Sequence, residues 1–339
     1  MIDLEAIARV GAPDLTHPDA VRAGIAHSVA YLASDAALES IAVDPYWPKW
    51  DSPWWHMLLL LELGEARAIP GPAAAAMTAG IDRLLHTFPI GAAATAGLDS
   101  SRDLACHCAL GAMAQVLGAC GIDVAHALPW VRPWFARYQM RDGGFNCDDD
   151  AYLATDECPS SMVGTIGVLE ALLAAPSLAP ADRTTRDRAA GFLIERALVH
   201  GSASVQNAAE RDAASAWTAP TFPRFYFYDV LRGLTALLRW SESTGELVPE
   251  RAIDAAVRAL LAHAPDGIVR VARNAYAAHT TLEPTADRSP SPRRRPASRF
   301  PLLVATSEIG APSATLTAHW TAARAALLRL HASGRIVRA

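Results

Sequence analysis

Lysine is nearly missing from this chain, and so are long apolar runs. Lys49 is the single lysine among the 339 residues, and arginine supplies the rest of the side-chain positive charge. The formal net charge of −5 does not indicate a nucleic-acid partner. Apolar runs such as residues 57–61 fall far short of the ~20 residues that a membrane span needs. We therefore expect neither a nucleic-acid surface nor a membrane span.

The cysteines lack the pattern of a disulfide framework, and the first residues do not resemble a signal peptide. Five cysteines are an odd number, and their spacing is uneven. The N-terminal residues are acidic and amphipathic, without a basic segment followed by an apolar core. Both features predict a cytoplasmic, reducing environment.

Alternating strand patterns are also missing, whereas alanine and leucine recur at helical spacing. Together with 51% apolar residues, this pattern predicts an all-α fold. The expected helices cover about 2–10, 18–34, 52–64, 71–86, 102–119, 125–140, 159–175, 181–199, 222–241, 249–263 and 312–332.

The expected helices are of two types that repeat along the chain. Helices of one type are amphipathic and end at a glycine or polar turn. Helices of the other type begin with an unusual polar or aromatic cluster and are then almost wholly apolar. These clusters occupy residues 51–56, 103–108, 158–161, 224–229 and 314–319. A period of roughly 50–65 residues indicates a repeat architecture.

A closed ring of helical hairpins satisfies this pattern. Helices that are apolar all round must be buried, and an inner ring buries them while the amphipathic helices cover the outside. We therefore predict a single domain, 1–339, built as an (α/α)6-type toroid with a central cavity. The clusters at the starts of the inner helices would then lie at one end of this cavity.

Residues 280–299 break the repeat. Proline, serine and arginine dominate this segment, and it has no apolar face. Such a composition predicts a flexible or extended loop. Its basic tract, Arg293 to Arg295, is either solvated or in contact with a partner.

One segment carries a family motif. Residues 138–145, YQMRDGGF, resemble the Q-x-x-D-G-G-(F/W) motif of the terpenoid cyclase and protein prenyltransferase superfamily. The resemblance implies an α/α toroid, in agreement with the architecture expected from the repeat. We expect this segment to be the turn that holds an outer helix to an inner one.

Three branches of that superfamily use motifs that differ from this sequence. Class II cyclases protonate an alkene with D-x-D-D-T-A, whereas residues 147–151 read CDDDA. Protein prenyltransferases bind zinc through an Asp-x-Cys pair and a distant histidine, but the order here is Asn-Cys-Asp. Lanthionine cyclases bind zinc through a cysteine and a later Cys-His pair, and this chain has the reverse order.

The order of reactive residues is most similar to that of linalool dehydratase/isomerase enzymes. Their site combines an aspartate, a histidine, two cysteines and tyrosines in that order along the chain. The resemblance implies these site residues: Asp51, His107, Cys147, Cys158 and Tyr226 or Tyr228.

The residue types alone leave alternatives open for the histidine and the cysteines. Successive side chains on a helix point ~100° apart, so Cys106, His107 and Cys108 cannot all face one point. His107 is an acid or base facing the cavity, a satisfied core histidine or a ligand. Cys147 and Cys158 are either a pair in different protonation states or small buried side chains. Together with His107 they could also bind zinc.

Carboxylates offer further candidates for an acid. Asp148 stands beside Asp149 and Asp150, and crowded carboxylates can serve as a proton donor, with a solvated turn as the alternative. Asp51 stands among tryptophans, where a desolvated carboxyl group suits general-acid chemistry. Its alternative role is to cap the helix that begins near Ser52.

Aromatic side chains gather at the expected mouth of the cavity. Those that we expect to contact substrate are Trp54, Trp55, Tyr152, Tyr226 and Tyr228. Their π faces can stabilise a carbocation and shape a pocket for an isoprenoid, although each one singly also suits core packing.

These features together predict a lyase or isomerase that uses no metal or cofactor. It would dehydrate, hydrate or isomerise an apolar, isoprenoid-like alcohol or alkene. Asp51 or His107 would move the proton at the hydroxyl group, and Cys147 or Cys158 would serve the allylic carbon. The alternatives are a zinc-dependent prenyltransferase or lanthionine cyclase-like enzyme, and a non-catalytic toroid that binds a peptide or lipid. A homo-oligomer is compatible with the sequence.

Overall fold

Helices make up most of the protein. The computed structural model describes residues 2–88, 90–91, 94, 105–275, 280–283 and 293–338. Helices dominate this part of the chain, which confirms the all-α prediction. None of the helices described there is long and apolar enough to cross a lipid bilayer.

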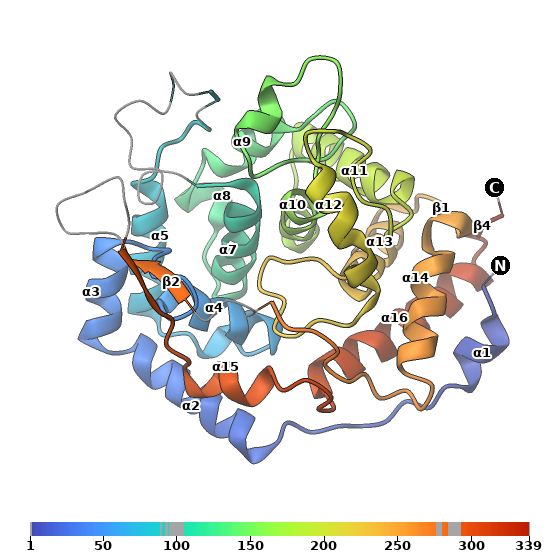
Figure 1. The fold of residues 1–339 in the computed structure, drawn as a ribbon, viewed down its shortest axis with the longest axis horizontal. Coiled ribbons are helices and arrows are strands. Elements are labelled where there is room, and N and C mark those ends of the chain that lie inside the picture. The colour runs from blue at the N-terminus through green and yellow to red at the C-terminus, as the bar shows by residue number, and fades with distance from the viewer. Residues whose placement is uncertain are drawn as a thin grey trace.

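Five largely buried helices surround the middle of the molecule (Figure 1). They are α4 (Pro53–Glu62), α7 (His107–Ala119), α10 (Met162–Ala174), α13 (Val230–Thr244) and α16 (Ala314–Ala332). Each of them packs against the next in that order. In α4 every residue from Pro53 to Leu60 is buried. Helices that are apolar all round were expected to be buried, and α4 is an example.

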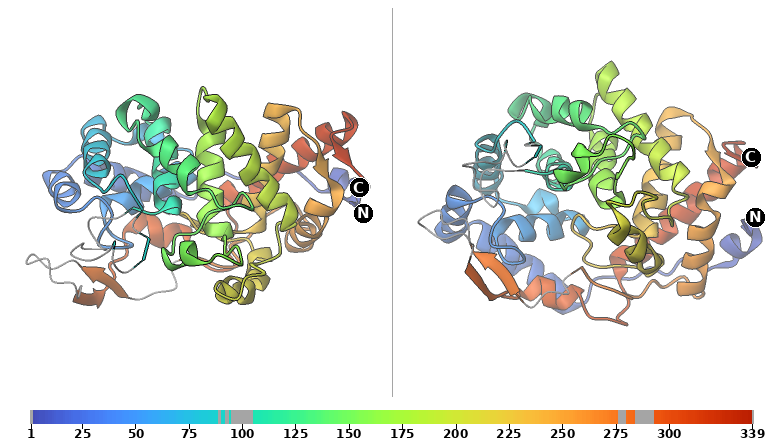
Figure 2. Two further views of the ribbon diagram at one scale, coloured as in Figure 1. Left: turned by 90° about the horizontal axis from the view of Figure 1, so that it is seen from above. Right: turned by 45° about the horizontal axis from the view of Figure 1, so that its top comes forward.

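Ten further α-helices in the described residues flank this inner group (Figure 2). They are α1 (Leu4–Arg9), α2 (Asp19–Leu32), α3 (Asp35–Val43), α5 (Gly71–Asp82), α8 (Val124–Ala127), α9 (Val131–Tyr138), α11 (Pro180–Glu195), α12 (Ala208–Ala213), α14 (Glu250–His263) and α15 (Pro301–Thr306). Short 3-10 helices occur at η1 (Ala66–Ala68), η2 (Asp150–Leu153) and η3 (Ala214–Thr218). Helix α11 packs against α9, α10, α13 and α14, and α15 packs along α2.

Strands are short in the part of the chain described. β1 (Val248–Pro249) pairs in parallel with β4 (Ile336–Val337), and β2 (Thr280–Glu283) pairs antiparallel with β3 (Arg293–Pro296). The second pair comes from the two ends of the segment rich in proline, serine and arginine. These ends are extended, as expected, but they also pair with each other. Residues 284–292 lie outside the described residues.

The Q-x-x-D-G-G-F motif is a structural turn. Gly143 has φ 91°, and a side chain there would collide with the backbone of α11. The Gln139 amide donates to the carbonyl oxygens of Gly143 and Thr185, both at 2.8 Å, and so connects the end of α9 to α11. Phe145 is fully buried, and its carbonyl oxygen accepts the Ser161 N–H at 2.8 Å, just before α10. The motif therefore holds α9, α10 and α11 together, as expected.

Two inner helices begin later than predicted. Helix α7 begins at His107 because Cys106 has an extended backbone, with φ −124° and ψ 166°. Helix α13 begins at Val230 because Asp229 is extended and its carboxylate caps the first turn. Before it, Phe225 has φ 54°, a conformation that no right-handed helix contains. The polar and aromatic clusters at these positions therefore precede the helices.

Three short helices, α3, α12 and α15, were not predicted. Helix α15 has six residues, too few to be stable on their own. It depends on tertiary packing against α2, where a side chain in place of Gly24 would come within 2.7 Å of Leu302 Cα. A single sequence pattern does not reveal such a partner.

Helices α7 and α10 are in direct backbone contact. A methyl group added at Gly111 would lie 2.5 Å from the Gly167 carbonyl carbon. One added at Gly167 would lie 3.2 Å from the Cys108 carbonyl oxygen. This close crossing fixes the first turn of α7 against α10.

We predict that Gly111→Ala destabilises the protein by ~1–3 kcal/mol, because the added methyl group forces the two helices apart. Gly118→Ala is the matched control on the same helix, since a methyl group there meets nothing within 4 Å. Alanine favours a helix over glycine, so the control variant should gain up to ~1 kcal/mol. Urea unfolding of both variants measures the difference. Equal stabilities would contradict the close crossing.

Candidate functional site

Three cysteine thiols meet just before and within the first turn of α7. The sulfur atoms of Cys106, Cys108 and Cys147 all lie within 4.8 Å of one another. The sulfurs of Cys106 and Cys108 are 3.2 Å apart, and the Cys108 N–H donates to the Cys147 sulfur at 3.3 Å. Because Cys106 precedes the helix, the ~100° step between helical neighbours does not separate it from Cys108. The three neighbours do not all face one point, as expected, because His107 lies outside the cluster, but Cys106 and Cys108 do come together.

His107 lies among aromatic rings. Its ring centroid is 5.1 Å from that of Phe88 and 5.3 Å from that of Phe145. Its Nδ1 donates to the Asn146 carbonyl oxygen at 2.8 Å, so the buried Nε2 atom carries no proton, and it has no hydrogen-bond partner among the residues described. Burial lowers the pKa of His107 to about 4. The imidazole is therefore neutral near pH 7.

One of the three thiols loses its proton more easily than the others. Hydrogen bonds from Cys108 and Cys147 hold the pKa of Cys106 well below its usual value. The pKa values of Cys108 and Cys147 are both raised. The larger cause is the hydrogen bond of each thiol with Cys106, and burial raises both values further. Cys106 is therefore the thiol of the cluster that most easily becomes a thiolate base, while Cys108 and Cys147 hold their protons more tightly.

Two tyrosine hydroxyls lie in the same electrostatic neighbourhood. The hydroxyl oxygens of Tyr46 and Tyr226 are 3.2 Å apart. Burial raises the pKa of both tyrosines well above the usual value, and negative charge on the nearby cysteine cluster acts on both in the same direction. The phenols therefore stay protonated and can donate a proton in a hydrogen bond.

A cage of aromatic rings encloses the only lysine. The Lys49 ammonium nitrogen lies 4.8 Å from the ring centroid of Trp50, 5.8 Å from that of Trp55, 5.3 Å from that of Tyr226 and 5.6 Å from that of Phe227. Burial lowers the pKa of Lys49, while charge on Cys108 and Cys106 opposes this effect. The surrounding rings thus offset part of the cost of burying the ammonium charge.

The loop that carries Lys49 is held by its own polar groups. One Asp44 carboxylate oxygen accepts the backbone N–H groups of Tyr46 and Trp47 at 2.8 and 2.9 Å. The Ser52 hydroxyl donates to the Tyr46 carbonyl oxygen at 2.8 Å. These bonds fix Tyr46 in the segment that leads to α4.

Three of the predicted catalytic residues lie away from the thiol cluster or are engaged elsewhere. The Asp51 carboxylate accepts hydrogen bonds from Arg295 at 3.1 Å and from Ser298, and Ser52, not Asp51, is the N-cap of α4. Asp148 is exposed, and its carboxylate accepts the Asp150 N–H in the turn before η2, which matches the solvated alternative. Cys158 is outside the cluster, with its sulfur 3.6 Å from the Ser160 hydroxyl.

The predicted aromatic residues divide between two places. Trp55 and Tyr226 are part of the cage around Lys49, and Trp54 packs against Tyr46, with ring centroids 5.3 Å apart. Tyr152 instead stacks beside His107, at 5.8 Å. Tyr228 donates to the Leu198 carbonyl oxygen at 2.9 Å and fills space against α13.

Sequence reasoning missed Tyr46, Lys49, Cys106 and Cys108 as members of one site. The signal was present in the segment Tyr46-Trp-Pro-Lys-Trp50, where a single lysine stands between aromatic residues. A lone lysine in such a setting favours a cation–π contact. Its ring partners from 226–227 come from a segment more than a hundred residues later, which no local pattern indicates.

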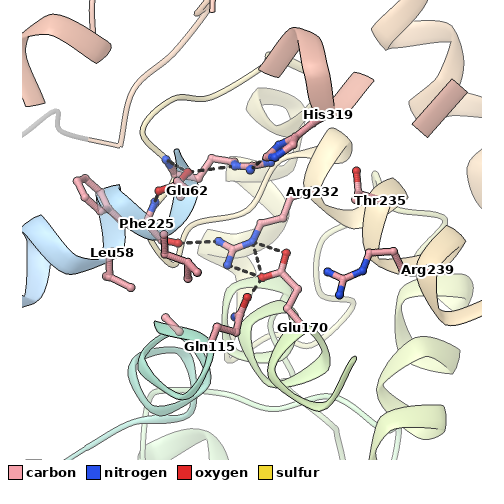
Figure 3. A pocket seen from close by; sticks show the side chains of 12 residues that line it. Leu58, Glu62, Gln115, Glu170, Phe225, Arg232, Thr235, Arg239 and His319 are labelled. Carbon is pink, nitrogen blue, oxygen red and sulfur yellow. Dashed lines mark hydrogen bonds and ion pairs between the residues drawn. The ribbon is translucent and has the colours of Figure 1, made fainter. Parts of the chain in front are cut away.

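A second polar region lies at the centre of the five inner helices (Figure 3). A cavity of about 200 Å³ is lined by residues from all five of them and from the segment before α13. The lining residues are Leu58, Leu61, Glu62, Ala112, Gln115, Glu170, Arg224, Phe225, Arg232, Thr235, Arg239 and His319. Arg224 pairs with Glu62 at 3.3 Å, and Arg232 pairs with Glu170 at 2.6 Å.

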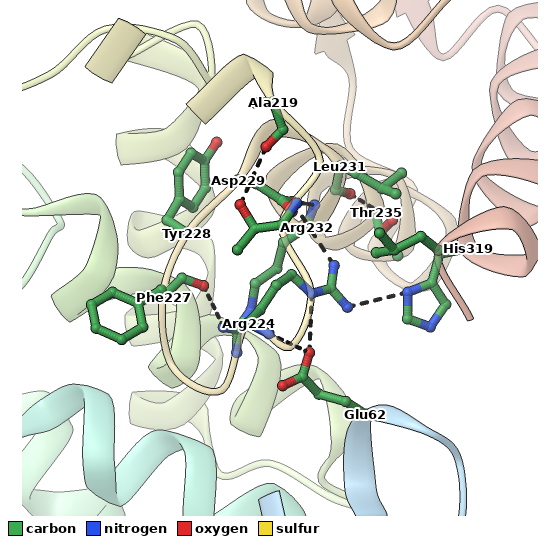
Figure 4. Close-up of polar contacts among 12 residues, drawn as sticks. Glu62, Ala219, Arg224, Phe227, Tyr228, Asp229, Leu231, Arg232, Thr235 and His319 are labelled. Carbon is green, nitrogen blue, oxygen red and sulfur yellow. Dashed lines mark hydrogen bonds and ion pairs between the residues drawn. The ribbon is translucent and has the colours of Figure 1, made fainter. Parts of the chain in front are cut away.

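These two ion pairs hold the aromatic segment before α13 (Figure 4). The Glu62 carboxylate accepts the backbone N–H groups of Arg224, at 2.9 Å, and of Phe225. The Arg232 guanidinium donates to the carbonyl oxygens of Phe225 and Phe227 at 2.9 and 2.7 Å. Tyr226, between them, is thereby placed in the cage around Lys49.

Comparisons of the chain with protein-family models, with curated proteins and with solved structures find no match. The resemblance to the terpenoid cyclase and protein prenyltransferase superfamily therefore stays a prediction. A proposal about function rests on the geometry of the site alone.

We predict that the pH dependence of stability reports the buried state of His107. The unfolded chain binds a proton at this residue below pH ~6.5, whereas the folded chain binds it only near pH 4. The unfolded state thus holds more protons in this range, so stability falls as the pH falls. In His107→Gln this contribution is absent. The decrease in the free energy of unfolding between pH 7.5 and pH 5 should therefore be about 2 kcal/mol smaller than in the wild type.

Chemical unfolding at a series of pH values measures this effect. His263→Gln is the matched control, since His263 is exposed at the end of α14. The control should lose stability as the wild type does. A slope in His107→Gln equal to that of the wild type would show that His107 is not held neutral.

Proposed function

We propose that this chain is a lyase or isomerase that carries out acid–base chemistry on an apolar, isoprenoid-like alcohol or alkene. The observation that carries the proposal is the aromatic cage around a positive charge, next to three thiols and two paired phenols. A cage that stabilises the Lys49 ammonium group also suits an allylic carbocation at the same place, with the lysine side chain moved aside.

The α/α toroid is part of the proposal. Helices α4, α7, α10, α13 and α16 pack in chain order and line one central cavity. Most of the other helices pack outside them, for example α11 against α9, α10 and α14. This arrangement supports an inner and an outer layer, as a toroid requires.

The groups at the site can donate and accept every proton that a dehydration moves, and the reaction needs no redox step. The Tyr226 phenol, which is paired with Tyr46, donates a proton to the substrate hydroxyl group, the C–O bond breaks, and water leaves. The Cys106 thiolate takes a proton from the carbon next to the cation, and a C=C bond forms. Proton transfer from the thiol back to the phenolate restores both groups. The reverse sequence is hydration, and return of the proton to a different carbon is isomerisation.

This assignment differs from the expectation for Asp51 and His107. The Asp51 carboxylate is engaged by Arg295 and Ser298, and His107 faces an aromatic cluster. Cys147 stays in the proposal as a thiol hydrogen-bonded to the Cys106 thiolate.

The thiol cluster also favours a second candidate, a zinc-dependent transferase or cyclase. Three sulfur atoms within 4.8 Å of one another fit a zinc ion with little movement, since Zn–S bonds of ~2.3 Å place tetrahedral sulfurs ~3.8 Å apart. Cys106, Cys108 and Cys147 would hold the ion, and a fourth position would remain for substrate. Zinc there would supply Lewis-acid chemistry. If the purified protein contains stoichiometric zinc, and the Cys106→Ser variant loses it, the zinc-dependent function would be favoured over the metal-free one.

We predict turnover of at least one terpenoid alcohol or alkene, detected by mass spectrometry after incubation with a panel of such compounds. Cys106→Ser and Tyr226→Phe should each lower the rate by ~10²-fold or more, because each removes a group that moves a proton. Cys120→Ser is the matched control, since Cys120 lies outside the cluster.

The control should retain the wild-type rate. A folded wild-type protein that converts no compound in the panel would contradict the proposal. So would variants at Cys106 and Tyr226 that react as fast as the wild type.

A further inference from the structure

A second, larger pocket adjoins the central cavity. This pocket, of about 690 Å³, lies between the C-terminal ends of α7 and α10 and helices α8 and α9, and we call it the apolar groove. Leu61, Gln115 and Arg239 line both the cavity and the groove. The two spaces therefore meet at these three side chains. The groove has the size of pockets that hold small organic ligands, about 300–1,000 Å³.

The groove is lined mainly by apolar side chains. Val131 and Phe135 of α9 are buried along one side of it, and Leu172 and Leu173 of α10 lie on the other. Three charged residues also line it: Arg239; Arg132, which pairs with Asp182 at 3.4 Å; and Asp123, whose carboxylate accepts backbone N–H groups at the start of α8. A flexible hydrocarbon chain suits such a surface.

Arg239 stands where the groove meets the cavity, and no carboxylate in the described residues pairs with it. The two carboxylates of the cavity are already occupied, since Glu62 binds Arg224 and Glu170 binds Arg232. Among the lining residues three guanidinium groups thus face two carboxylates, and Arg239 supplies the excess positive charge. Figure 3 shows its guanidinium group beside Glu170 without a bond to it.

The other polar groups at this place also favour a negative ligand. The His319 Nδ1 accepts a hydrogen bond from Arg224 at 3.2 Å, so its Nε2 atom carries the proton. Burial and the Arg224 charge lower the pKa of His319 to about 3, which keeps the ring neutral and its free N–H a donor. The Gln115 amide nitrogen is used on backbone carbonyls and on Glu170. Its oxygen remains as an acceptor, whereas Arg239 and the His319 Nε2–H remain as donors for a negative ligand.

We propose that the cavity and the apolar groove together bind a small molecule with one anionic head group and an apolar chain. The head, a carboxylate or phosphate, binds Arg239 and is within the reach of donors at the cavity mouth. The chain lies along α7 and α10 in the groove. This site is separate from the thiol cluster, and it stands or falls independently of the proposed enzymatic activity.

Titration calorimetry with dodecanoate, dodecyl phosphate, dodecan-1-ol and acetate, all below micelle formation, tests the proposal. We expect dodecanoate or dodecyl phosphate to bind saturably and at least tenfold more tightly than dodecan-1-ol or acetate. The first two probes also tell a carboxylate site from a phosphate site. If neither binds the folded wild-type protein, the proposal is wrong.

Two variants separate the head from the chain. Arg239→Gln should weaken the anionic probe about tenfold or more and leave dodecan-1-ol unchanged, whereas Arg251→Gln, an exposed arginine on α14, should change neither. Gly118→Leu should fill the groove, because a side chain at Gly118 enters open space. Gly118→Leu should weaken the binding of dodecanoate and of dodecan-1-ol to the same extent, without lowering the stability of the protein. Anion binding unaffected by Arg239→Gln, or by Gly118→Leu, would overturn the proposal.

Discussion

The two buried ion pairs at the centre of the inner helices are the constraint on which the site depends. Glu62 of α4 and Arg224, and Glu170 of α10 and Arg232 of α13, bring charges from distant parts of the chain into the interior. Desolvation makes such pairs costly, and they persist only when each charge has good partners. Here the partners include backbone groups of 224–227, so the same atoms that neutralise the charges also shape an irregular segment.

That segment connects the polar centre to the proposed catalytic region. Phe225 has a positive φ, a strained conformation that needs support from its surroundings. Glu62 and Arg232 supply the support from opposite sides of the backbone. Tyr226 and Phe227 can then face Lys49, and Tyr226 can meet Tyr46. A change in the ion pairs would therefore reach the aromatic cage through the backbone of residues 224–227.

The molecule thus places two unlike environments on either side of one segment. On one side lie the aromatic cage, the phenols and the thiols, which suit proton transfer to and from an apolar substrate. On the other side lie the polar cavity and the apolar groove, which suit an amphipathic anion. The groups of the first environment lie mainly at helix starts and in connecting segments, whereas Gln115, Glu170 and Arg239 of the second lie within the inner helices.

Much of the helical pattern could be predicted from the sequence, because burial imposes a period that can be read locally. The turn at 142–145 could be predicted too, since Gly143 needs a positive φ and Phe145 needs a buried place. The thiol cluster could not, because it depends on one residue, Cys106, that stops short of the helix. The role of Asp51 depends on Arg295, 244 positions away, and such a partner leaves no local trace.

Hydrogen–deuterium exchange in Glu62→Gln tests most directly whether the ion pairs hold the aromatic segment. The glutamine side chain offers one acceptor oxygen to the two amides that Glu62 now accepts, Arg224 N–H and Phe225 N–H. The peptide covering 222–229 should exchange markedly faster than in the wild type, while that of α10 keeps its protection. Glu242→Gln, at a surface ion pair with Arg329, is the control and should exchange as the wild type does. Unchanged protection of 222–229 in folded Glu62→Gln would contradict the account.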